Sequence, residues 1–213
     1  MKKTLTVSAA LAALALATAT VANADTTETY DFTGFDELDI AAGVEVIYET
    51  GDAYSVVAHF SKGGPDDMKI RQDGDRLYIS KKVTSGWGDQ LHVRLHITSP
   101  ELNAIEASSG SSIEASGIDS ENFDLEATSG ASADVTGTCG TITVKANSGG
   151  TADAKALKCE RVKASASSGG SVRAYASAEA KSKTSSGGGV DIWGDPPVRE
   201  ANHSISGGDT DFH

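Results

Sequence analysis

The chain has 213 residues, a formal net charge of −12, 6% aromatic residues and 23 glycines. This excess of negative charge argues against nucleic acid or an anionic membrane as the partner, since both attract positive charge. With so few large side chains and so many glycines, the composition also excludes an ordinary globular core and favours thin layers that stack regularly.

Residues 1–24 have the pattern of a secretory signal peptide. Two lysines precede an apolar stretch over residues 5–21, which is followed by the small residues Ala22-Asn23-Ala24. Cleavage after Ala24 would leave 189 residues and, because two lysines and no acidic residues are lost, move the net charge from −12 to −14. Neither a second stretch long enough to span a bilayer nor a lipoprotein cysteine follows. We therefore expect a periplasmic, secreted or cell-surface protein.

Residues 25–100 alternate between polar and apolar residues in short, irregularly spaced stretches, which predicts strands. The predicted strands cover residues 37–40, 44–48, 55–60, 68–72, 76–80 and 91–98. The Asp73-Gly74 pair between two of them is typical of a β-hairpin turn. Most of the bulkier apolar residues lie here, and we expect this N-terminal β part to close one end of the fold.

From residue 101 to the C-terminus the chain repeats. A Ser-Gly pair recurs with spacings of 20, 19, 20, 18 and 20 residues, starting at Ser109, Ser129, Ser148, Ser168, Ser186 and Ser206. The residues four and six places after each serine are apolar except Thr210, and those between them are mostly polar. This alternation predicts a strand with one buried face. A second strand precedes the serine, so each repeat supplies two short strands and a Ser-Gly turn, where glycine can take a positive φ and serine can bond the local backbone.

A repeat of two strands without a returning helix buries its apolar faces by coiling, so that equivalent strands stack in parallel. We therefore expect an all-β protein, a right-handed parallel β-solenoid or β-helix with rungs of about 20 residues over 101–213, forming one continuous domain with 25–100. The hand is not determined by the sequence alone. The small inward side chains predict a narrow coil.

The two cysteines test this register. Cys139 and Cys159 each lie nine residues before the next repeat serine, and thus at the same position in successive rungs. Stacked strands are about 4.8 Å apart, and a disulfide accepts Cα separations of about 4.4–6.8 Å. In an exported protein this predicts a Cys139–Cys159 disulfide, worth about 3 kcal/mol. The alternative, a redox or metal pair, lacks a C-x-x-C motif and a third ligand.

The order of these motifs resembles a known family. Phe35-Asp36-Glu37-Leu38-Asp39-Ile40 leads into Gly43-Val44-Glu45-Val46-Ile47, and the Ser-Gly rungs end in Gly187-Gly188-Gly189-Val190 and Trp193-Gly194-Asp195-Pro196. From about Phe32 to Phe212 the chain resembles the bacterial putative auto-transporter adhesin family with the head GIN domain, a domain of unknown function. The resemblance implies a β-solenoid, a periplasmic or cell-surface location and no known catalytic residues. The cysteine pair and the alanine-rich interior depart from the commonest form of the pattern.

The residue five places after each serine is acidic in three successive rungs: Glu114, Asp134 and Asp153. If the rungs stack, these carboxylates form a column with steps of about 5 Å. Their mutual repulsion would favour a hard cation such as Ca²⁺, the one cofactor that the sequence suggests. The alternative is a solvated acidic face that is relieved by Arg173 in the next rung.

A second polar column lies three places before each serine, and it reads Glu106, Glu126, Lys145, Ser165 and Lys183. Glu126 beside Lys145 predicts an ion pair between rungs.

Other candidate sites lead to no reaction. His92 and His96 alternate with apolar residues on a strand, about 13 Å apart, so they cannot share a metal. The chain has no G-x-S-x-G elbow, P-loop or dinucleotide fingerprint. We expect a non-catalytic, exported binding or adhesin-like module with an envelope, glycan or protein ligand. A carboxylate-based polysaccharide lyase or hydrolase and a purely structural envelope protein are the alternatives.

Overall fold

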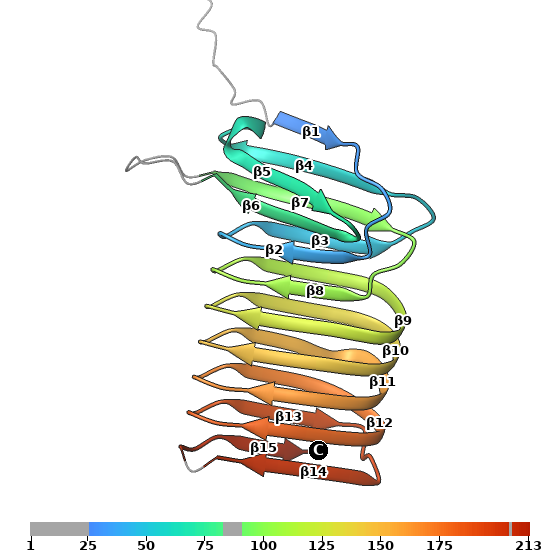
Figure 1. The fold of residues 1–213 in the computed structure, drawn as a ribbon, viewed down its shortest axis with the longest axis vertical. Helices are drawn as coiled ribbons and strands as arrows, with labels where there is room; N and C mark the ends of the chain where they lie inside the picture. Colours follow the sequence, from blue (N-terminus) through green and yellow to red (C-terminus); the bar gives the residue numbers. More distant parts are fainter. Residues whose placement is uncertain (1–25, 83–90, 205) are drawn as a thin grey trace, which may run out of the picture.

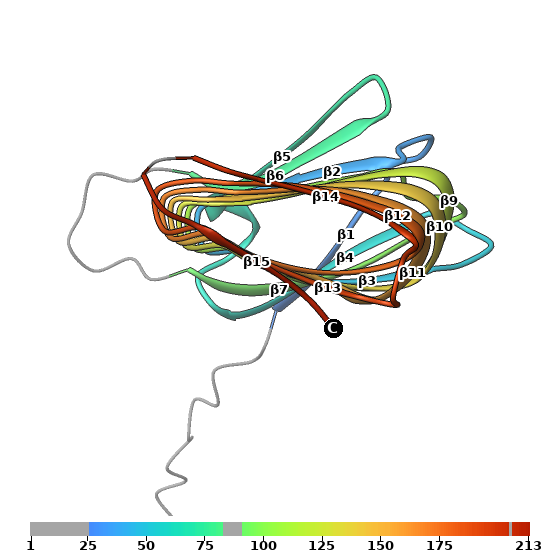
Figure 2. The ribbon, with the colours of Figure 1, turned by 90° about the horizontal axis from the view of Figure 1, so that it is seen from below.

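The computed structural model describes residues 26–82, 91–204 and 206–213. Its strands all belong to one sheet, which coils into stacked rungs along the long axis of the molecule (Figure 1). Viewed along that axis, the coil is a flattened tube with two long faces (Figure 2). The predicted β-solenoid with a less regular N-terminal part is confirmed. The predicted signal peptide lies outside the described residues.

The strands in chain order are β1 (Thr26–Tyr30), β2 (Glu37–Ile40), β3 (Glu45–Thr50), β4 (Ser55–Lys62), β5 (Met68–Asp73), β6 (Arg76–Lys81), β7 (His92–Ser99), β8 (Ala104–Ala107), β9 (Ser112–Thr128), β10 (Ser132–Asn147), β11 (Thr151–Ala166), β12 (Ser171–Thr184), β13 (Gly189–Trp193), β14 (Val198–His203) and β15 (Asp209–Phe212). A short 3-10 helix, η1 (Pro65–Asp67), precedes β5.

The regular rungs are β9 to β12, which are 14 to 17 residues long and pair in parallel with their neighbours. The sequence predicted two short strands per repeat. Instead, each of these strands bends around one edge of the tube and covers both faces, because hydrogen bonding between rungs continues through the bend. Differences in repeat length are absorbed there as register shifts, such as the one between Asp134 and Gly137. The faces on either side therefore stay in register.

The Ser-Gly pairs form tight turns at the opposite edge of the tube. In the turn at Ser129-Gly130, both residues have positive φ, +53° and +74°, and the Ala131 amide donates to the Thr128 carbonyl at 3.0 Å. This is the geometry of a type I′ turn. The amide of Gly130 also donates to the carbonyl of Ser148 in the next rung at 3.2 Å. The serine thus contributes a left-handed backbone, which the sequence had assigned only to glycine.

Replacing Ser129 with asparagine is expected to stabilise the protein. A left-handed conformation costs most L-residues about 1–2 kcal/mol, whereas asparagine tolerates it and is preferred in type I′ turns. We expect Ser129→Asn to gain about 0.5–1 kcal/mol, which raises the midpoint of thermal unfolding by about 2 °C. Ser132→Asn, at an exposed position of β10, is the matched control. An equal rise in the control would refute the explanation by turn geometry.

The interior is a continuous apolar column of mostly small side chains. Ala133, Ala152 and Val172 stack through successive rungs, and all are at most 1% exposed. The N-terminal rungs hold the larger side chains, such as Phe35, Tyr48 and Phe60. The buried Tyr48 hydroxyl is satisfied by the Ser99 hydroxyl at 2.9 Å. The small inward side chains predicted for the repeat are therefore found in the interior.

In the N-terminal part, the order of rungs in space differs from their order in the chain. β2 pairs in parallel with β6 on one side and β8 on the other, and β3 lies likewise between β7 and β9. The β2–β3 rung is thus enclosed between rungs that follow it in sequence. β4 and β1 then extend one face in antiparallel order. The predicted hairpin at Gly74 joins β5 to β6 and projects from the tube in Figure 2.

Polar residues end the core at the C-terminal rung. Three positions of β14 continue the inward columns, and they carry Arg199, Ala201 and His203. The Arg199 guanidinium lies over the Phe212 ring, 5.2 Å from its centroid, and the His203 Nδ1 is 2.8 Å from the Thr184 hydroxyl. Inward-pointing charged residues disfavour edge-to-edge association of sheets. The last rung is therefore poorly suited to extending the apolar stack.

Candidate functional site

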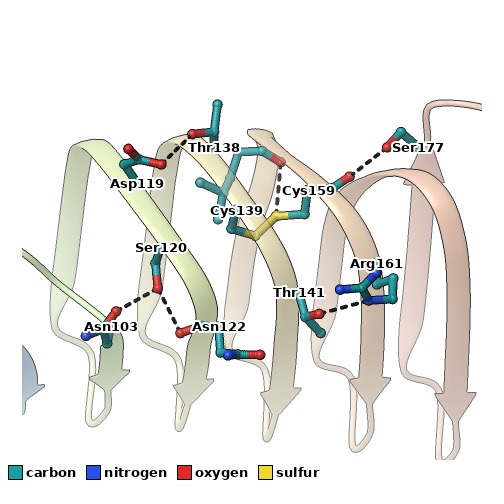
Figure 3. The surroundings of a disulfide bond; sticks show 11 residues. Asn103, Asp119, Ser120, Asn122, Thr138, Cys139, Thr141, Cys159, Arg161 and Ser177 are labelled. Carbon is teal, nitrogen blue, oxygen red and sulfur yellow. Dashed lines mark hydrogen bonds between the residues drawn. A yellow bond between two sulfur atoms is a disulfide. The ribbon is translucent and has the colours of Figure 1, made fainter.

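The Cys139–Cys159 disulfide is present at the bend between two rungs (Figure 3). The two residues are direct partners in the β10–β11 register, and their Cα atoms are 4.5 Å apart. Hydrogen bonds also join successive rungs at this bend, including Thr138 to Asp119 and Arg161 to Thr141, both at 3.1 Å. Since both cysteines of the chain form the bond, neither is a free thiol that could bind a metal.

The acidic column has the predicted register. It lies on the face of the tube formed by the segments that follow the Ser-Gly turns, which we call the first face. Glu114, Asp134 and Asp153 are direct partners across β9, β10 and β11, and Arg173 follows in β12. The Arg173 guanidinium is 3.2 Å from one Asp153 oxygen, and the amide of Lys155 donates to the other at 3.1 Å. Both carboxylate oxygens of Asp153 therefore already accept a hydrogen bond from within the protein.

No three His, Cys, Asp or Glu side chains in the described segments are placed to hold a metal ion. The contacts of Asp153 fit the predicted alternative, a solvated acidic face relieved by Arg173. Calcium binding by Glu114, Asp134 and Asp153 stays a prediction. A rise in the thermal midpoint with millimolar CaCl₂ that disappears in Asp134→Asn would support it.

Within the column, the ionised form of the Asp134 carboxyl is disfavoured. Partial burial raises the pKa of its carboxyl above the ordinary value, and the charges of Asp153 and Glu114 raise it further. A raised pKa in the folded state means that the ionised carboxylate costs stability above that pKa. The cost disappears as pH falls below the unfolded-state value of about 3.9.

Asp134→Asn is therefore expected to stabilise the protein at pH 7 by about 0.2–1 kcal/mol, the usual size of an exposed cross-strand charge effect. At pH 3 the two proteins should unfold at the same temperature. Thermal unfolding at both pH values measures the difference, with the exposed Asp52→Asn as control. A stabilisation that persists undiminished at pH 3 would contradict the electrostatic explanation.

Two histidines from different strands, His59 and His96, lie side by side on the outer surface. His92 and His96 lie on the outer face of β7, as predicted. However, His96 has a neighbour that sequence reasoning missed, since antiparallel pairing of β4 with β7 brings the His59 ring within 5.2 Å of it, centroid to centroid. The Thr27 hydroxyl is 3.2 Å from His59 Nδ1. No local signal could reveal this contact, because it depends on how two distant strands pair.

The second face of the tube is formed by the segments that precede the Ser-Gly turns, and its acidic and basic side chains lie in separate regions. The predicted column runs in register through Glu106, Glu126, Lys145, Ser165 and Lys183. The predicted ion pair is confirmed, because Lys145 Nζ lies 3.7 Å from Glu126 Oε2. Both side chains are partly exposed, so the pair contributes little to stability. The neighbouring column contains Asp124, Thr143, Lys163 and Lys181. This face is thus acidic over β8 and β9 and basic over β10 to β12.

Arg76 bridges two acidic side chains in the acidic half of this face. Its guanidinium contacts Glu37 at 2.7 Å and Glu106 at 2.9 Å. The hydrogen bond to Glu37 raises the pKa of Arg76 most, with a smaller contribution from Glu106, so the guanidinium remains charged. Asp124 and Glu126 line a hollow of about 150 Å³ together with Arg76 and its two partners. This charge arrangement has no nucleophile beside a base and so suggests no reaction.

The described part of the chain contains no helix with the length and apolarity of a membrane span. Its coiled sheet has a solid apolar interior and two flat, charged outer faces, which defines a rigid repeat scaffold with extended exposed surfaces.

The chain belongs to the family described as putative auto-transporter adhesin, head GIN domain, whose model matches residues 34–196. This confirms the family that the motif order indicated.

Solved structures share the fold. The chain is similar to a putative adhesin from Bacteroides fragilis with a TM-score of 0.69 and 17% identity, over 90% of this chain and 97% of that one. It is also similar to a putative adhesin from Parabacteroides merdae with a TM-score of 0.58 and 11% identity, over 89% and 96% of the two chains. No curated protein matches the chain.

Proposed function

We propose that the protein is a non-catalytic binding module that is exported and acts in the cell envelope or at the cell surface. The observation that carries this proposal is the outer surface of the solenoid. Charged side chains stand in columns at steps of about 4.8 Å, in register across successive parallel rungs. Such a surface is rigid and extended, which suits a long or flat partner better than a small substrate.

Family membership and the N-terminal sequence support the same proposal. The family is named for adhesion, and the pattern of residues 1–24, with predicted cleavage after Ala24, is that of an exported protein. The disulfide fits an oxidising compartment outside the cytoplasm. The polysaccharide-enzyme alternative has less support, because one carboxylate of the acidic column, Asp153, is already paired with Arg173.

The test uses the mature chain, fluorescently labelled, with bacterial cells and a panel of purified glycans. We expect saturable retention with no change in the glycan. Unsaturated products or new reducing ends would instead establish the enzyme. Absence of retention on every surface would leave the structural role and overturn the proposal. Protease accessibility of the protein on intact cells would distinguish a surface location from a periplasmic one.

A further inference from the structure

Four lysines line one groove on the second face of the solenoid. Lys145 of β10, Lys163 of β11, and Lys181 and Lys183 of β12 surround a shallow groove of about 310 Å³. The rest of the lining is mostly small or polar and includes Ala164 and Ser165, and one acidic residue, Glu200, also lines the groove. The four lysines are exposed. Because lysine side chains extend four methylene groups before the ammonium, they supply both aliphatic walls and a positive rim.

The register brings these positive charges together. Lys163 is the direct partner of Lys181, with strands about 4.8 Å apart. Lys145 and Lys183 lie on either side of Ser165, two strand spacings or about 9.6 Å apart. Like charges directly opposite each other in a sheet destabilise it. This arrangement therefore costs stability instead of adding to it.

The protein compensates only part of this charge. Lys181 pairs with Glu179 at 2.7 Å, and Lys145 has the 3.7 Å contact with Glu126. Lys163 and Lys183 make no ion pair with any residue that the structure describes. Glu200, the register partner of Lys181 in β14, is the one acidic residue that lines the groove. In a chain of net charge −12, four lysines around a groove with one acid form an unusual feature. Anionic groups of a ligand could form ion pairs with Lys163 and Lys183.

We propose that this lysine groove binds an acidic glycan whose anionic groups are separated by sugar rings. The proposal rests on the proposed binding function and names its ligand class. The aliphatic lysine stems can contact the C–H surfaces of a sugar, while the ammonium groups pair with carboxylate or sulfate substituents. Lysine acts as a point charge and does not require the planar, two-pronged geometry that arginine selects.

The surrounding charges favour a ligand of low charge density. Double-stranded DNA carries one charge per about 1.7 Å, and the net charge of this protein would repel it. The acidic half of the same face, including Asp124 and Glu126, lies directly beside the groove. Lys183, however, lies three strand spacings from Glu126, or about 14 Å. Electrostatic effects fade over about 8 Å at physiological salt, so this end of the groove can hold isolated anionic groups.

The experiment measures binding of the mature chain to a hexasaccharide of galacturonic acid and to its methyl-esterified form, which lacks the charges. We expect at least tenfold weaker binding of the ester. The double variant Lys163→Gln/Lys183→Gln, which keeps most of each side chain, should also weaken binding of the acid at least tenfold. Its thermal midpoint should be unchanged or higher, because a like-charge contact has been removed. A sulfated hexasaccharide identifies which anionic substituent the groove prefers.

The control is Lys62→Gln/Lys69→Gln, which removes the same charge from exposed positions of β4 and β5. It should bind within twofold of the wild type. Equal weakening in both double variants, equal binding of acid and ester, or no binding of either charged hexasaccharide would overturn the inference. Full retention of Lys163→Gln/Lys183→Gln on cells would overturn it while leaving the proposed function intact. Loss of retention by the wild type itself would overturn the proposed function.

Discussion

Replacement of Gly137 by alanine is expected to lower the midpoint of thermal unfolding by about 10 °C, a loss of about 3–4 kcal/mol. Gly137 lies at the bend of β10, opposite Ile118, with a φ of +139°. A Cβ at this position would overlap the backbone carbonyl of Ile118. The conformation is almost exclusive to glycine, and a backbone carbonyl in the hydrogen-bonded sheet cannot move away as a flexible side chain could.

The matched control is Gly130→Ala in a Ser-Gly turn. Gly130 also has a positive φ, +74°, but no atom lies within 4 Å of the position that a Cβ would occupy. Its alanine variant should lose only the conformational part, about 1–2 kcal/mol. The difference between the two variants therefore measures the close approach of β9 and β10. Equal losses would show that the bend can relax around a side chain.

The second large effect concerns the disulfide. The double variant Cys139→Ala/Cys159→Ala is expected to lose about 3 kcal/mol, because the bond closes a 20-residue loop and restricts the unfolded chain. This corresponds to a drop of about 6–12 °C in the thermal midpoint. Reductant should destabilise the wild type by a similar amount and leave the double variant unchanged.

Thiol counting provides an independent check of the bond. The denatured, unreduced protein should contain no reactive thiol, and the reduced protein should contain two. A reactive thiol before reduction would refute the cross-link. The disulfide should also stabilise its own two rungs against local opening, because in a repeat protein each rung is held mainly by its neighbours. We expect loss of the bond to expose β10 and β11 to hydrogen exchange more than β3.

Some features of this protein were determined by the sequence alone. The nearly regular spacing of the Ser-Gly pairs predicted which residues are partners between rungs, including Cys139 with Cys159 and the column through Glu114, Asp134 and Asp153. Both were found in register. The prediction succeeded because each repeat has the same pattern, a turn followed by alternating polar and apolar residues. When such similar units stack, only one register buries all the apolar faces.

Other features were decided by the tertiary structure. Residues 26–82 have no common period, so nothing in them shows that the β2–β3 rung lies between two later rungs, or that His59 meets His96. The lysine groove depends on Lys163 and Lys181 lying in register beside the Lys145 column. The left-handed serine of the five turns from Ser109 to Ser186 was missed because a type I′ turn imposes that conformation on whichever residue precedes glycine. A repeat specifies the contacts between its own copies, whereas contacts between unlike segments depend on how the whole chain packs.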